Sequence, residues 1–230
     1  MGSVYIFERE KEEWRLRQRL AIRPGQPWDL FGSALSLKKD SLLIGAPRAE
    51  APQWENGAAY LYQKTALRGG SWSLLKTLSS PHTLDLGAAV ALSDGNIVVG
   101  ENYENSVGYV RSFAGGLSSW NEVQRLDSPD VPPWIHFGQV LLLSKGWLLA
   151  SNSRFASGQV GYQPVPGMVH AFLPQGNGQW VPFDTLASPQ PTGGDAFGYA
   201  LASNERSIFV GAPALYRSSA GAVYEYQIGP

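Results

Sequence analysis

One unit of four short words recurs in fixed order along the chain, and this repeat constrains the fold more than any other feature. The first word is Gly, any residue, a small apolar residue and then an alternation ending in an aromatic; the second is Trp followed six residues later by Leu. The third is an aromatic residue or Leu followed by Gly, and the fourth is an apolar triplet leading to a small residue. The first word lies at 2–7, 57–62, 108–113, 167–172 and 221–226, the second at 14–20, 72–78, 120–126 and 180–186, the third at 31–37, 86–92, 137–143 and 197–203, and the fourth at 42–47, 97–102, 147–152 and 208–213.

Each word has the pattern of a β-strand. In the first word the side chains alternate between two faces, so that Val4 and Ile6 oppose Tyr5 and Phe7. The apolar triplets of the fourth word are typical of strands buried on both faces, and a small residue follows them: Gly45, Gly100 and Gly211, with Ala150 expected in the remaining copy. The charged run at 9–20 resembles a helix, but its alignment with the other Trp words predicts a strand.

A unit of four short antiparallel strands that recurs every 51 to 60 residues is typical of a propeller blade. One blade cannot bury both faces of its sheet, whereas blades packed face to face around an axis can. The composition agrees, because Gly and Pro number 26 and 16 and only 16% of residues are charged. We therefore predict an all-β propeller of four-stranded antiparallel blades, with 17 strands or about four blade-equivalents, alone or as part of a larger ring.

The third and fourth words carry a family resemblance. Phe31-Gly32 with Gly45-Ala46-Pro47, and Phe197-Gly198 with Gly211-Ala212-Pro213, resemble the FG-GAP repeat propellers. The resemblance covers the whole chain, and it is closer to bacterial members than to the integrin alpha-chain heads. It implies a propeller fold, a role in binding or cell adhesion, and an extracellular or cell-envelope setting, but it names no ligand.

The blade count follows from the order of the words. We expect one domain over 1–230, made of a partial blade (1–30), three blades (31–85, 86–136 and 137–196) and a second partial blade (197–230). The first word has five copies and the others four, so 221–226 competes with 2–7 for one place in a closing blade. Either a terminal strand pairs outside a blade or the ring is larger, and the sequence leaves both open.

Composition limits the function. With 18 basic and 19 acidic residues there is no positive excess to hold a phosphate backbone, so we expect no nucleic acid partner. The absence of Cys excludes thiolate catalysis, disulfides and Cys-ligated zinc. No apolar run approaches the roughly 20 residues that span a bilayer, so we expect no membrane insertion. The N-terminus lacks the pattern of a signal peptide, which leaves a cytoplasmic location open.

No motif indicates a catalytic centre or a cofactor, so the chain is predicted not to be an enzyme. Members of the family that it resembles commonly bind calcium between the first and second strands of a blade. Here those loops offer at most one carboxylate each, and three of them hold a cation, so we predict no metal there. The loops lie at 38–41, 93–96, 144–146 and 204–207.

Three Asp and three His residues are the titratable side chains that call for a functional or a structural interpretation. Asp29, Asp85 and Asp195 precede the third word, where they either cap the turn or form a carboxylate cluster near the central funnel. We favour capping. His82 and His136 lie in loops and are weak candidates for a metal pair, whereas His170 occupies the column of Tyr5 and Tyr60 and is expected to replace a packing aromatic.

The longer loops gather at one end of the predicted ring and carry aromatic residues and arginines. Such side chains on a rigid scaffold are typical of recognition surfaces, although several of them would equally well cover blade ends. The longest loop, 151–166, is expected to be ordered and to contact a partner. The partner-binding candidates are Arg48, Trp54, Tyr103, Trp134, Arg154, Phe155, Tyr162, Tyr216 and Arg217.

Three functions remain in competition at this point. The favoured one is a non-catalytic module that binds a protein partner through the long-loop face, as an adhesion or assembly subunit. In the second, Trp28, Trp54 and Trp134 stack on sugar rings and the Asp residues supply acid–base groups for carbohydrate binding or cleavage. In the third, the chain is a spacer that self-associates through its terminal strands. In every case Trp14, Trp72, Trp120 and Trp180 are expected to be buried anchors between blades.

Overall fold

The computed structural model describes residues 2–49, 56–65, 70–80, 85–102, 107–116, 119–129, 136–152, 166–191, 194–204, 206–214 and 220–228. Within these ranges the chain forms seventeen strands and no helix. The strands are β1 (Val4–Glu10), β2 (Glu13–Leu20), β3 (Ala34–Lys38), β4 (Ser41–Ala46), β5 (Ala58–Lys64), β6 (Trp72–Leu78), β7 (Leu86–Ser93), β8 (Asn96–Glu101), β9 (Tyr109–Gly116), β10 (Ser119–Leu126), β11 (Leu141–Ser144), β12 (Trp147–Ser151), β13 (Met168–Gly176), β14 (Gln179–Ala187), β15 (Ala200–Ser203), β16 (Ser207–Ala212) and β17 (Ala222–Gln227).

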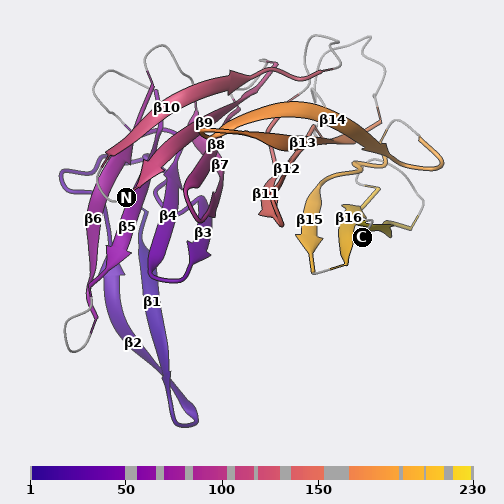
Figure 1. The fold of residues 1–230 in the computed structure, drawn as a ribbon. Helices are drawn as coiled ribbons and strands as arrows, with labels where there is room; N and C mark the ends of the chain where they lie inside the picture. The colour runs from indigo at the N-terminus through magenta and orange to yellow at the C-terminus, as the bar shows by residue number, and fades with distance from the viewer. Residues whose placement is uncertain are drawn as a thin grey trace.

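The strands form antiparallel sheets that follow one another around an arc (Figure 1). The first blade is β3-β4-β5-β6, the second blade is β7-β8-β9-β10, and the third blade is β11-β12-β13-β14. Before them stands the N-terminal hairpin β1-β2, and after them the three-stranded C-terminal sheet β15-β16-β17. This arrangement is the predicted β-propeller of four-stranded antiparallel blades. The charged run at 9–20 contains the end of β1, a two-residue turn and the whole of β2, and no helix.

Neighbouring blades bury two different faces of each sheet. We call the face toward the preceding blade the front face and the face toward the following blade the rear face. In the first blade, Leu43 and Leu61 lie on the rear face and pack against Phe113 and Trp120 on the front face of the second blade. Side-chain alternation along each strand therefore supplies both interfaces, and the apolar core of the molecule lies between the sheets.

The glycine of the fourth word, which we call the GAP word, allows neighbouring blades to approach each other closely. A Cβ atom on Gly45 would lie 2.0 Å from the carbonyl oxygen of Gly87 in the second blade, and one on Gly100 would lie 2.4 Å from that of Gly138 in the third. In the third blade Ser151, not Ala150 as expected, takes this place, since Gly138 N donates to the carbonyl oxygen of Ser151 at 2.9 Å. The equivalent bond in the first blade joins Gly32 N to the oxygen of Gly45.

Three of the four tryptophans of the second word are buried anchors, as predicted: the exposed fractions of Trp72, Trp120 and Trp180 are 8%, 8% and 2%. Two are also clamped by a glutamine from the preceding sheet. The Gln124 amide donates to Trp180 O at 2.9 Å and accepts from Trp180 N at 2.7 Å. Gln18 makes the same pair of bonds to Trp72, both at 2.8 Å.

The prediction that Trp14 is buried is wrong. Its side chain is 69% exposed, because it lies on the front face of the N-terminal hairpin and no described segment covers that face. The hairpin is not joined to the C-terminal sheet: β1 pairs with β2, and β17 pairs with β16. The two words that compete for one place in a closing blade thus lie in separate sheets, at opposite ends of the arc (Figure 1).

Candidate functional site

The predicted long-loop face falls mostly outside the described residues. Of the nine candidates only Arg48 is described: it is exposed, and its Nε lies 3.9 Å from Asp85 Oδ1. The other candidates, and 153–165 of the longest loop, lie outside the described ranges, so their role as a contact surface stays a prediction. They are Trp54, Tyr103, Trp134, Arg154, Phe155, Tyr162, Tyr216 and Arg217.

Two of the three Asp residues at the strand entries, Asp29 and Asp195, accept hydrogen bonds from backbone groups. Asp29 is 4% exposed and its Oδ2 accepts from Gln26 N at 2.5 Å. Asp195 is 9% exposed, and its Oδ1 accepts from Phe197 N at 3.1 Å and from Gly167 N at 3.4 Å. Buried carboxylates that accept backbone N–H bonds fix the turns that lead into the strands. Asp29 and Asp195 therefore cap their turns, as the sequence indicates.

Two of the three histidines are described, and both are buried. His170 is fully buried, with Nδ1 3.1 Å from Thr185 Oγ1 and its ring 5.7 Å from that of Phe137. It occupies the predicted place in the aromatic column. His136 is also buried, and His82 lies outside the described residues. Among the described residues, no group of three or more His, Asp or Glu side chains is placed to hold a metal ion.

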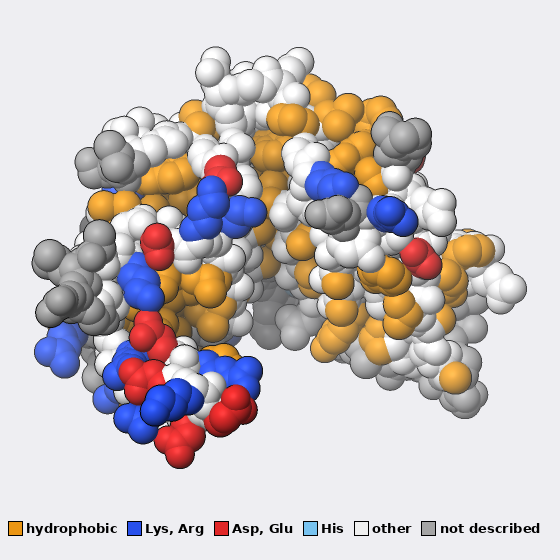
Figure 2. Space-filling view, turned by 60° about the horizontal axis from the view of Figure 1, so that its bottom comes forward, with side chains coloured by type: hydrophobic (Ala, Val, Ile, Leu, Met, Phe, Trp, Pro, Cys, Tyr) orange, Lys and Arg blue, Asp and Glu red, His pale blue; other side chains and the backbone are white. Residues whose placement is uncertain are grey.

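The short turns between first and second strands surround a cavity of about 740 Å³, lined by side chains that include Lys38, Lys145 and Trp147. Asp94, the carboxylate of its turn, pairs with Lys39 of the neighbouring turn at 3.2 Å. Figure 2 shows the surface hollowed between the two halves of the arc. Lys38 and Lys145, two of the cations on which we based the prediction of no calcium site, line this cavity, and that prediction stays a prediction.

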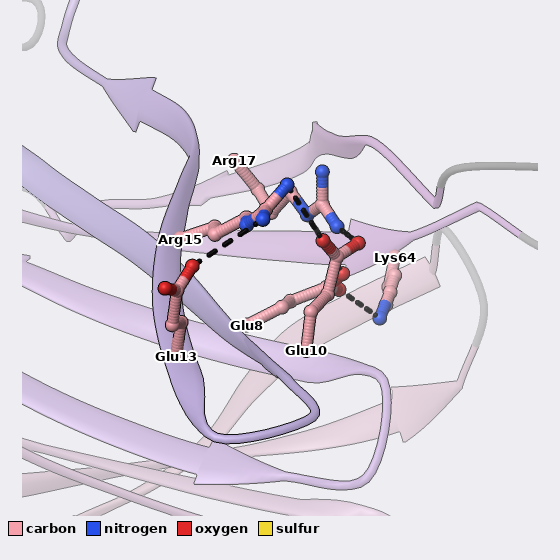
Figure 3. A network of polar contacts seen from close by, with 6 residues as sticks. All are labelled: Glu8, Glu10, Glu13, Arg15, Arg17 and Lys64. Carbon is pink, nitrogen blue, oxygen red and sulfur yellow. Dashed lines mark hydrogen bonds and ion pairs between the residues drawn. The ribbon is translucent and has the colours of Figure 1, made fainter.

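The N-terminal hairpin projects beyond the blades and carries its acidic groups on the rear face. Glu8 accepts from Lys64 of the first blade at 2.8 Å, and Arg17 pairs with both Glu8 and Glu10 (Figure 3). The Lys64 ammonium holds the pKa of the Glu8 carboxyl below its usual value, through its hydrogen bond and its charge. The Glu8–Lys64 pair joins the hairpin to the first blade, as does Val4, which packs in one apolar cluster with Phe31 and Leu42. Charged side chains dominate its tip, at the lower left of Figure 2.

The front face of the hairpin is apolar and uncovered. Tyr5, Phe7 and Trp14 are 52%, 52% and 69% exposed. The residues at the same repeat positions in the first blade are buried under the hairpin: Tyr60, Tyr62 and Trp72 are 7%, 6% and 8% exposed. We call Tyr5, Phe7 and Trp14 the hairpin front face.

Sequence reasoning missed the hairpin front face as a candidate surface. The signal that pointed to it was the fifth copy of the first word, together with a Trp word that has no third and fourth word before it. Arg19 lies with its guanidinium carbon 6.0 Å from the centre of the Tyr5 ring, so the face also carries a cation.

The fold and these interfaces define a β-propeller with an exposed blade face. An FG-GAP repeat model matches residues 14–62, which span the hairpin strand β2 and three strands of the first blade. With the propeller arrangement, this match supports the assignment of the chain to the FG-GAP repeat β-propellers. No curated protein matches the chain.

Solved structures share the fold at low sequence identity. A protein from Lactobacillus plantarum is 12% identical with a TM-score of 0.56, over 85% of this chain and 55% of that one. A Bacteroides fragilis protein proposed to be a 6-phosphogluconolactonase is 13% identical with a TM-score of 0.50, over 97% of this chain and 73% of that one. The chain thus spans about half the length of the first of these structures. No described segment is a helix long and apolar enough to cross a membrane.

Proposed function

We propose that this chain is a non-catalytic protein-interaction module that serves as an adhesion or assembly subunit. The hairpin front face carries the proposal: three aromatic side chains remain more than half exposed at positions where the first blade buries the equivalent side chains. Aromatic residues and arginine are the side chains that contribute most energy at protein interfaces. The blades behind them are held by buried cores and glutamine clamps, so the surface stands on a rigid scaffold.

The long-loop face is the second proposed contact surface, with Phe155 or Tyr162 as its anchor. Replacing both by Ala should weaken partner binding by at least about 2 kcal/mol and leave the melting temperature nearly unchanged, because interface anchors carry binding energy without holding the fold. A variant that unfolded, or that bound normally, would show that the loop is packing.

The test is capture of partners from the native source by the immobilised wild-type protein, compared with the Phe155→Ala/Tyr162→Ala variant and with Trp14→Asp. Mass spectrometry identifies what co-purifies, and the captured protein is then titrated in purified form. A partner that binds the wild type and is lost with one variant supports the module and locates its surface. Equal capture by all three proteins would contradict both proposed surfaces.

A carbohydrate-binding or carbohydrate-cleaving propeller is the alternative. Trp28, 76% exposed, offers a stacking platform beside Asp29. The Asp29 carboxylate is buried and accepts a backbone N–H, which favours capping over acid–base chemistry. A glycan array and a polysaccharide depolymerisation assay separate the two functions, and hydrolysis of 6-phosphogluconolactone is a further assay because of the fold neighbour's name.

A further inference from the structure

The chain exposes a second blade face, at its other end. Val223 in β17 is 72% exposed, whereas the residues at the same repeat position in the three blades, Ala59, Val110 and Val169, are all fully buried. These residues lie on rear faces, where the following blade covers them. Val223 therefore lies on a rear face that no described segment covers.

The glycine of the last GAP word points the same way. A Cβ on Gly45 or Gly100 would collide with the backbone of the following blade, but a Cβ on Gly211 would meet nothing closer than its own sheet's Ala200, at 3.4 Å. Gly211 thus provides room for a close backbone approach that nothing in the described chain makes. We call Val223, Gly211 and Glu225 the C-terminal rear face.

We propose that the hairpin front face of one copy of this chain docks on the C-terminal rear face of a second copy, head to tail. This inference rests on the proposed interaction function and names its partner. Each blade interface within the chain joins a front face to a rear face, and these two exposed faces are the unmatched halves of that same interface. The contact is heterologous, because it joins two different surfaces.

Charge supports this pairing over a contact between two hairpins. The register of the hairpin places Arg19 opposite Tyr5 and Arg9 opposite Trp14, so both share the front face with the aromatics; Arg9 is paired with Glu12 at 3.0 Å. The C-terminal rear face carries Glu225, which is exposed at a position where the first blade has the buried Leu61. Two hairpin front faces in contact would bring arginines together, whereas the head-to-tail contact brings arginine to glutamate.

Sedimentation equilibrium of the purified chain over a range of concentrations tests the contact. We expect the wild-type mass to rise above that of the 25.0 kDa monomer, and Trp14→Asp and Val223→Asp each to weaken association at least tenfold. The matched control is Leu74→Asp: Leu74 is 50% exposed and lies opposite Tyr62 on the front face of the first blade, so it belongs to neither docking face. The control should associate like the wild type.

Mixing the two variants gives the decisive result. Trp14→Asp retains an intact rear face and Val223→Asp an intact front face, so the equimolar mixture should form a dimer that neither variant forms alone. A wild type that stays monomeric up to about 200 μM, or a mixture that stays monomeric, would overturn the proposal. Loss of association in Trp14→Asp alone, with Val223→Asp unaffected, would also overturn it and would indicate a contact between hairpins.

A second measurement covers the case in which an Asp variant fails to fold. The chain has no Cys, so Tyr5→Cys and Val223→Cys each create a single reactive site. A short bis-maleimide should link a mixture of these two proteins into a heterodimer, and no such product would contradict the docking. Sedimentation and cross-linking measure self-association, whereas the capture experiment detects a different protein. The failure of this contact is therefore distinct from the failure of the proposed function.

Discussion

The sharpest stability prediction compares the same word of the repeat in two settings. Trp180 is 2% exposed, packs in the cluster between the second and third blades, and donates its Nε1–H to Ser112 Oγ at 3.0 Å. Trp180→Ala removes that bond and opens a cavity, which costs about 3–5 kcal/mol. Trp14 is 69% exposed, so Trp14→Ala should change the free energy of unfolding by no more than about 0.5 kcal/mol.

Urea unfolding measures the difference in the free energy of unfolding, at a protein concentration low enough to keep the chain monomeric. Thermal unfolding gives the matching shift in melting temperature, which is about 2–4 °C per 1 kcal/mol for a chain of this size. Trp180→Ala should therefore lower the melting temperature by about 6–20 °C and Trp14→Ala by about 2 °C or less. The dependence on urea should stay the same, because both proteins expose similar surface on unfolding. Equal losses in the two variants would refute the view that burial between blades, and not the Trp word itself, stabilises the fold.

Gly45→Ala should destabilise the fold by at least about 1–3 kcal/mol, since its Cβ would lie 2.0 Å from the Gly87 oxygen, whereas Gly211→Ala should unfold like the wild type in the same urea titration. Burial, aided by the nearby Asp29 charge, raises the pKa of Tyr60 to about 12 from an ordinary value of 10.0. The folded chain then keeps a proton that the unfolded chain releases, so stability should fall as the pH rises from about 10 to 12. Replacing Tyr60 by Phe should flatten that alkaline decline, and an unchanged pH profile would contradict it.

The sequence was sufficient to predict the fold because each word of the repeat is a local pattern. Alternation in the first word and the apolar triplet of the fourth word each specify a strand, and fixed spacing specifies the blade. The capping roles of Asp29 and Asp195 and the buried place of His170 were predictable for the same reason, since each depends on its position within a word.

Other features were not predictable because they depend on contacts between distant segments. The place of the GAP glycine in the third blade falls to Ser151 and not Ala150, and only the pairing with Gly138 reveals this one-residue shift. The Gln18 and Gln124 clamps join residues far apart in sequence, and nothing in the Trp word itself requires them.

The sequence by itself determined the strands, their order and the two kinds of blade face, because side-chain alternation along a strand is a local property. Only the tertiary structure decided which of those faces is covered. Tyr5 and Tyr60 occupy the same position of the same word, yet one is 52% and the other 7% exposed. The difference arises because burial requires a neighbouring sheet: Tyr60 has the hairpin in front of it, and no described segment stands in front of Tyr5.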